Sequence, residues 1–161
     1  MSKHSMLLFA VSAFALTACN PFRHKPAVEV GAADLNLNSR WHANLASPSD
    51  LAGAVQMNGT ASMAPSAKSG NTDVVLVLAN ATPGGVHPWQ LHRGQCGADE
   101  GIFGPADAYQ PVTVDRDGHA SSSATIPLQT PTTGSYFVIV RASAANATTT
   151  VACGNLAPPT K

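Results

Sequence analysis

Residues 84–97 read GGVHPWQLHRGQCG and form the most informative stretch of the chain. A turn at Pro83 and Gly84 leads into it, and two histidines, a Trp and a Cys follow within a few positions. Imidazole and thiolate groups are frequent metal ligands, so the stretch is a candidate metal site. Its chemistry depends on the secondary structure around it and on the ligands that the rest of the chain supplies.

Short β-strands are indicated on both sides of this stretch. Residues 72–81 (TDVVLVLANA) and 135–143 (SYFVIVRAS) are rich in β-branched and aromatic side chains, which favour strands. The pair Asp117-Gly118 between apolar arms is typical of a hairpin turn. Residues 97–110 (GADEGIFGPADAYQ) show no strand pattern and predict a loop. The expected strands are 41–45, part of 53–67, 72–81, 86–92, the two arms of 111–128, 135–143 and 148–156.

The composition favours an all-β domain. The 161 residues are 44% hydrophobic and only 11% charged, and no long segment has the roughly 3.6-residue apolar period of a helix. About seven or eight short antiparallel strands joined by turns predict a sandwich or a barrel. The formal net charge is zero, so no basic face predicts a nucleic-acid partner.

The N-terminal segment predicts export and lipid attachment. Its apolar run MLLFAVSAFALTA follows a lysine, is too short to span a bilayer and suits a signal peptide. The run ends in LTAC (16–19), which resembles the bacterial lipobox, in which Cys19 is acylated and becomes the mature N-terminus. We expect a signal peptide at 1–18 and a lipidated tether at 19–40. Asn20 then implies an outer-membrane lipoprotein in the cell envelope, with its domain in the periplasm.

Cysteine usage agrees with an exported domain. If lipid occupies Cys19, then Cys96 and Cys153 remain as an even pair in an oxidising compartment. We expect a disulfide between them that closes a loop of more than fifty residues. Two free buried thiols are the alternative interpretation.

Several motifs together resemble the copper–zinc superoxide dismutase family. They are the strand from Val55 to Thr60, the turn and histidines of 83–97, the segment VTVDRDGHA, and VACGN (151–155) near the C-terminus. The resemblance runs from about Ala52 to Leu156. It implies a Greek-key β-barrel over 41–156, with 157–161 as a tail, and it pairs the same two cysteines.

The family's copper strand carries an H-x-H pair, because alternate residues of a strand point to the same side and reach one ion. The matching positions here are Gln90 and His92, with Leu91 turned into the core. An amide oxygen is a poorer copper ligand than an imidazole. His87 matches a family histidine that supports the frame through hydrogen bonds and does not bind metal.

Other family ligands are also replaced. The predicted loop 97–110 contains no histidine for zinc and retains only the carboxylates of Asp99, Glu100 and Asp107, which make a poor zinc cage. The last copper histidine falls at Val140 or Arg141, depending on the register. The family has an arginine that attracts superoxide, and Thr150 occupies the matching position in this chain. Of the copper ligands, only His92 remains.

These observations lead to a main hypothesis and two alternatives. The main hypothesis is an envelope lipoprotein with a superoxide dismutase-like barrel that is not catalytic and needs no cofactor. The first alternative is a copper-binding or copper-buffering protein that uses His92 with His87, His119 or a methionine (Met57 or Met63). The second is an active dismutase completed by a partner chain or by His42. The sequence indicates a membrane contact through the lipid and no particular protein partner or oligomeric state. In the simplest interpretation, His87 and His92 are hydrogen-bonded structural histidines and His119 is solvated.

Overall fold

The computed structural model describes residues 39–51 and 53–160, and these residues contain β-strands and short 3-10 turns without an α-helix. The expected signal peptide, the lipidated Cys19 and nearly all of the tether lie outside the described residues. Among the described residues there is no helix of the length and hydropathy needed to cross a bilayer. The strands are β1 (Trp41–Ala46), β2 (Asn58–Pro65), β3 (Thr72–Ala79), β4 (Val86–His87), β5 (Trp89–Gln95), β6 (Ala98–Ile102), β7 (Val112–Thr113), β8 (Ala120–Ile126), β9 (Tyr136–Arg141) and β10 (Thr150–Asn155), and the 3-10 turns are η2 (Ser49–Leu51) and η3 (Ala106–Ala108).

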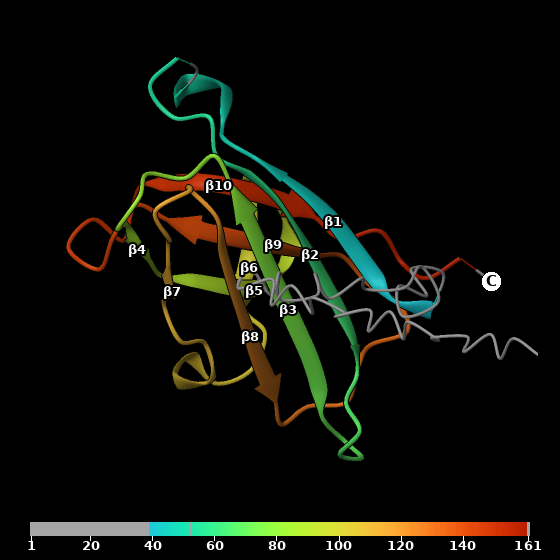
Figure 1. Ribbon diagram of the computed structural model, residues 1–161. Helices are drawn as coiled ribbons and strands as arrows, with labels where there is room; N and C mark the ends of the chain where they lie inside the picture. Colours follow the sequence, from blue (N-terminus) through green and yellow to red (C-terminus); the bar gives the residue numbers. More distant parts are fainter. Residues whose placement is uncertain (1–38, 52, 161) are drawn as a thin grey trace, which may run out of the picture. The chain divides into compact units, whose positions relative to one another are not determined.

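Eight strands form one antiparallel sheet in the order β6-β5-β9-β10-β1-β2-β3-β8, and β4 pairs separately with β7. The sheet curls so that β1, β2, β3 and β8 lie in one layer and β5, β9 and β10 lie in the layer behind it (Figure 1). The chain passes between these layers from β3 to β5 and again from β8 to β9, as in Greek-key connections. The expected all-β, Greek-key arrangement of antiparallel strands is therefore confirmed.

The core lies between the two layers because strand residues alternate between the inner and outer faces. On β3, Leu76 and Leu78 are fully buried, whereas Val77 between them is 44% exposed. From the opposite layer, the indole N–H of Trp89 on β5 donates to the hydroxyl of Ser122 on β8 at 3.1 Å. The same N–H donates to the carbonyl of Gln110 at 2.9 Å. Burial and hydrogen bonding thus hold the layers together at one aromatic side chain.

The register of β5, β9 and β10 determines which side chains share the outer face of that layer. Leu91 lies opposite Val138 and faces the core, as expected from the alternation. The residues on either side of these two face outward. Across the three strands, the aligned outward positions are Gln90, Ile139 and Cys153, then His92, Phe137 and Asn155.

The predicted loop 97–110 is partly wrong, because it contains strand β6 and the turn η3. β6 pairs with the edge of β5, although its sequence ADEGI has little intrinsic preference for a strand. The pairing includes an irregularity between His92 and Gly94, and Gly94 has a positive φ of 96° that favours glycine. Tertiary context therefore overrides local propensity in this segment.

The predicted hairpin 111–128 is wrong in its pairing. A tight turn does form, since the Asp115 N–H donates to the His119 carbonyl at 2.8 Å. The arms then separate, because β7 pairs with β4 and β8 pairs with β3. The sequence signal identified the turn but not the strands that it connects.

The alternation on β3 gives a direct stability test. Leu76→Ala removes a fully buried side chain, and it should lower the free energy of unfolding of the full chain by about 2–5 kcal/mol. Val77→Ala on the adjacent, exposed position should change it by about 0.5 kcal/mol or less. Chemical denaturation measures both. Equal losses from the two variants would contradict the assigned faces of β3.

Candidate functional site

His92 lies on the outer face of β5 and is only 7% exposed. Its Nδ1 is 2.8 Å from Asp99 Oδ1, and its Nε2 is 3.1 Å from Gln90 Oε1. The ring also packs against Phe137 of β9, with 5.4 Å between ring centroids. Each nitrogen of this imidazole therefore lies within hydrogen-bond distance of a neighbouring side-chain oxygen. Gln90 and His92 do share one side of β5, as the H-x-H spacing predicts.

Asp99 is the partner of His92 that sequence reasoning missed. It is carried by β6, which folds back along β5 directly after Cys96 and Gly97. Its Oδ1 also accepts a hydrogen bond from the Gly101 N–H at 2.7 Å. The hydrogen bond from His92, followed by the one from Gly101, holds the pKa of the Asp99 carboxyl below its ordinary value. In the sequence, the signal was an acidic residue a few positions after His92, just beyond a glycine-containing turn.

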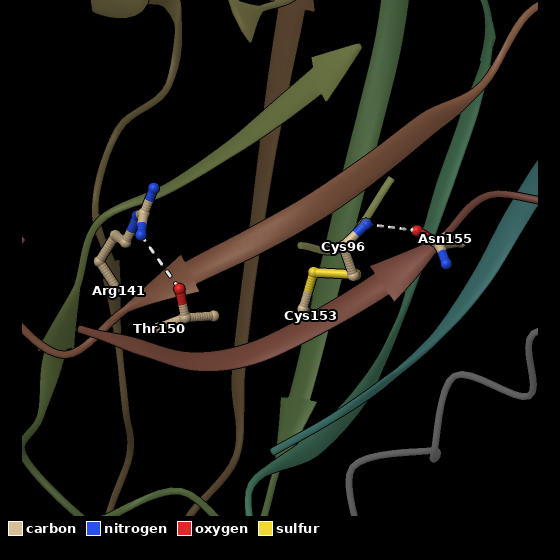
Figure 2. Close-up of a disulfide and its surroundings, with 5 residues drawn as sticks. All are labelled: Cys96, Arg141, Thr150, Cys153 and Asn155. Carbon is tan, nitrogen blue, oxygen red and sulfur yellow. Dashed lines mark hydrogen bonds between the residues drawn. A yellow bond between two sulfur atoms is a disulfide. The ribbon is translucent and has the colours of Figure 1, made fainter. Parts of the chain in front are cut away.

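The resemblance puts the family's last copper histidine at Val140 or Arg141, and of these two residues only Arg141 lies on the outer face. Val140 is fully buried in the core. Arg141 lies at the outer end of β9, where its backbone N–H donates to the Pro88 carbonyl at 2.8 Å. Its Nη1 donates to the Thr150 hydroxyl at 3.0 Å (Figure 2). The chain therefore places a guanidinium beside Thr150, although it comes from β9 and not from β10.

His87 lies on β4 and is 8% exposed. Its Nδ1 is within hydrogen-bond distance, 3.0 Å, of the Arg141 carbonyl, which connects β4 to the end of β9. Its Nε2 is buried without a hydrogen-bond partner. Gly85 lies close to this atom, and any larger residue at that position would place a Cβ 2.7 Å from Nε2. The contact to the Arg141 carbonyl agrees with the frame-supporting role that the resemblance implies.

The remaining candidate ligands lie elsewhere. His119 is exposed and lines a hollow on β2 and β3. Met57 and Met63 belong to the buried core. Within residues 39–51 and 53–160, no group of three or more His, Cys, Asp or Glu side chains could hold a metal ion together.

Cys96 and Cys153 form the expected disulfide, which joins the β5–β6 turn to β10. The Cys96 N–H donates to Asn155 Oδ1 at 2.8 Å, so a hydrogen bond reinforces the covalent connection (Figure 2). Both cysteines are half-buried and line a groove of about 520 Å³ on the outer face. The bond fixes the start of the segment that carries Asp99.

The donors around His92 do not fit the copper and zinc centres that the family resemblance implies. The single imidazole has a side-chain oxygen within hydrogen-bond distance of each nitrogen, and its neighbour on the strand offers only a neutral amide oxygen. Farther along the same face, beside Pro88 and Thr150, Arg141 carries a permanently charged guanidinium, which repels a metal cation. The arrangement is suited to holding a rigid hydrogen-bonded network.

No protein-family model matches the chain, and no curated protein is significantly similar to it.

The His92–Asp99 contact predicts a pH-dependent effect on stability. Because the folded pKa of Asp99 is lowered, its carboxylate stabilises the fold above the unfolded pKa of about 4 and loses this contribution as pH falls through the folded value. Asp99→Asn should therefore cost about 1 kcal/mol or less near neutral pH, with a smaller difference from the native chain in acid. Denaturation at a series of pH values measures it, with the neighbouring exposed Glu100→Gln as control. A difference that grows in acid would contradict the assignment.

The disulfide should contribute measurably to stability. The cysteines are separated by 57 positions, and cross-linking a loop of this length stabilises a fold by roughly 2–4 kcal/mol, mainly by restricting the unfolded chain. The double variant Cys96→Ser and Cys153→Ser should lose this amount in chemical denaturation of the full chain. A control is Ser123→Ala at an exposed position of β8, which leaves the disulfide intact. An unchanged midpoint in the double variant would show that the bond does not stabilise the domain.

Proposed function

We propose that the chain is an envelope lipoprotein whose superoxide dismutase-like barrel acts as a stable, non-catalytic module. The observation that supports this most directly is the engagement of both His92 nitrogens by Asp99 and Gln90. An imidazole that binds copper must direct an unprotonated nitrogen at the ion. In this structure, the nitrogen would first have to give up its contact with Asp99 or Gln90.

The chemistry of dismutation gives a second reason. The reaction needs a redox-active ion held by several ligands with one position open to the substrate. His92 is the single imidazole on the outer face of β5, and Arg141 brings a fixed positive charge to the same face. The guanidinium favours anions, but it cannot exchange electrons with them. The residues thus retain an attractive charge without a redox centre.

The location in the envelope rests on the sequence. The apolar N-terminal run and the LTAC motif at 16–19 support lipid attachment at Cys19, and an oxidising compartment suits a disulfide. A domain anchored in this way remains at the membrane surface without a membrane-spanning helix. We place it in the periplasm at the outer membrane.

The competing hypothesis is a copper-binding protein built on His92. Its additional candidate ligands are His87, His119 and the methionines. His87 is held at the Arg141 carbonyl, His119 lines another hollow, and Met57 and Met63 are core residues. No third ligand group accompanies His92 and Asp99 in the described part of the chain. The non-catalytic module is therefore the better supported function.

A combined metal and activity measurement tests the proposal. The full chain, incubated with copper and zinc and then desalted, should retain far less than one copper per chain and show no dismutase activity. His92→Ala should leave both values unchanged. The double variant Gln90→His and Arg141→His, which adds two imidazoles to the outer face that carries His92, should bind more copper than the native chain.

Two outcomes would contradict the proposal. Robust dismutase activity in the loaded native chain would establish an enzyme. Stoichiometric copper that is lost in His92→Ala, without activity, would favour the copper-binding hypothesis.

A further inference from the structure

A small apolar hollow lies at the end of the sheet where β1 begins. Its volume is about 270 Å³. Its apolar walls are formed by Trp41, Pro65, Pro131, Pro158 and Pro159. We call it the proline hollow. The last two prolines belong to the C-terminal segment, which the bridge between His42 and Ala157 holds beside β1 (Figure 1). The hollow therefore lies where the chain both enters and leaves the sheet.

The polar groups beside Trp41 already have partners. The indole N–H of Trp41 donates to the Pro131 carbonyl at 3.0 Å, and the Thr130 hydroxyl lies 2.9 Å from the Thr72 hydroxyl. The prolines have no backbone N–H to donate. Of the described residues, no charged one lines the hollow. The proline hollow is therefore suited to an apolar group, because a polar ligand would gain few hydrogen bonds in exchange for its contacts with water.

The size of the proline hollow indicates a side chain as its occupant. Sites for drug-sized ligands enclose roughly 300–1,000 Å³, and this hollow is smaller. It has room for aliphatic side chains that a neighbouring segment inserts between the prolines. Removal of those side chains from water would stabilise the contact.

The chain that precedes β1 begins at this hollow. Ser39 lines it, and β1 starts two residues later at Trp41. The residues immediately before Ser39 read ADLNLN (33–38) and contain Leu35 and Leu37. An extended chain advances by about 3.4 Å per residue, so these leucines lie within roughly 7 and 14 Å of Ser39 along the chain. Both are close enough to reach the hollow.

The spacing of the two leucines matches the buried side of β1. From 35 to 45, the odd positions are Leu, Leu, Ser, Trp, Ala and Leu, whereas every even position is Asn, Arg or His. Within β1, the odd residues Trp41, Ala43 and Leu45 are all buried. A period of two places Leu35 and Leu37 on one side of an extended segment. The chain bends at Arg40, outside β1, so this segment can turn over the hollow without continuing the strand.

We propose that the proline hollow binds residues 35–38 of its own chain through the side chains of Leu35 and Leu37. This contact fastens the end of the expected tether to the domain. The spacer that follows Cys19 then ends at residue 34, and its greatest span falls from about 70 Å to about 50 Å. The contact itself does not rest on the proposed function, because it requires neither a lipid on Cys19 nor any particular metal content.

The test uses the full chain with labelled leucine methyl groups and labelled amides in a dilute NMR sample. The methyl protons of Leu35 or Leu37 should show nuclear Overhauser contacts with the ring of Trp41 or with Pro131. The amides of 35–38 should exchange with solvent at least about tenfold more slowly than in an unstructured peptide.

Two double variants separate the apolar positions from the polar ones. Leu35→Asn with Leu37→Asn should abolish the slow exchange of 35–38 and shift the amide resonance of Thr132. Asn36→Ser with Asn38→Ser, which changes the alternate positions, should retain the slow exchange. Because both variants alter residues outside the buried core, both should keep the fold.

A third double variant changes the hollow and leaves the leucines in place. Pro158→Ser with Pro159→Ser removes part of the apolar wall and should also abolish the slow exchange. Three results would overturn the proposal. They are the absence of any leucine contact with Trp41 or Pro131, equal exchange of 35–38 in the leucine and asparagine variants, or contacts that arise only between differently labelled chains. The last result would assign the hollow to a second copy of the chain.

Discussion

The pairing of β5 with β9 is the constraint on which the rest of the structure depends. Its register places Trp89 and Leu91 inside and sends Gln90 and His92 outward. Because strand side chains alternate, a shift of one residue would exchange these sets and bury an amide and an imidazole in an apolar core. The disulfide, the Asp99 contact and the Arg141–Thr150 contact all lie on the face that this register defines.

The sequence allowed the strands with strong local patterns to be predicted. β1, β3, β9 and β10 each combine alternation or β-branched runs with clear turn residues, and all four lie where those patterns indicate. β6 could not be predicted in the same way, because its residues favour a strand only once β5 offers a free edge. The separation of β7 from β8 likewise depends on β3 and β4, which no local turn signal reveals.

The candidate site was predictable in its position but not in its contacts. Two-residue spacing was enough to place Gln90 and His92 on one side of a strand, and cysteine usage was enough to pair Cys96 with Cys153. The choice between Val140 and Arg141 required the strand register. In a continuous run of apolar residues, the sequence does not show which residues face the core and which face outward. The partnership of His92 with Asp99 required the fold of β6.

Strand β6 has a consequence for solubility. It is one of the two outermost strands of the sheet, and an open strand edge can pair with another molecule and start aggregation. β6 is short, carries the acidic residues Asp99 and Glu100, and is distorted near Gly94 and Gly101, which both have positive φ values. Charge and irregular backbone at such an edge discourage intermolecular sheet growth. The segment that holds His92 in place is therefore also a poor template for pairing with a strand of another molecule.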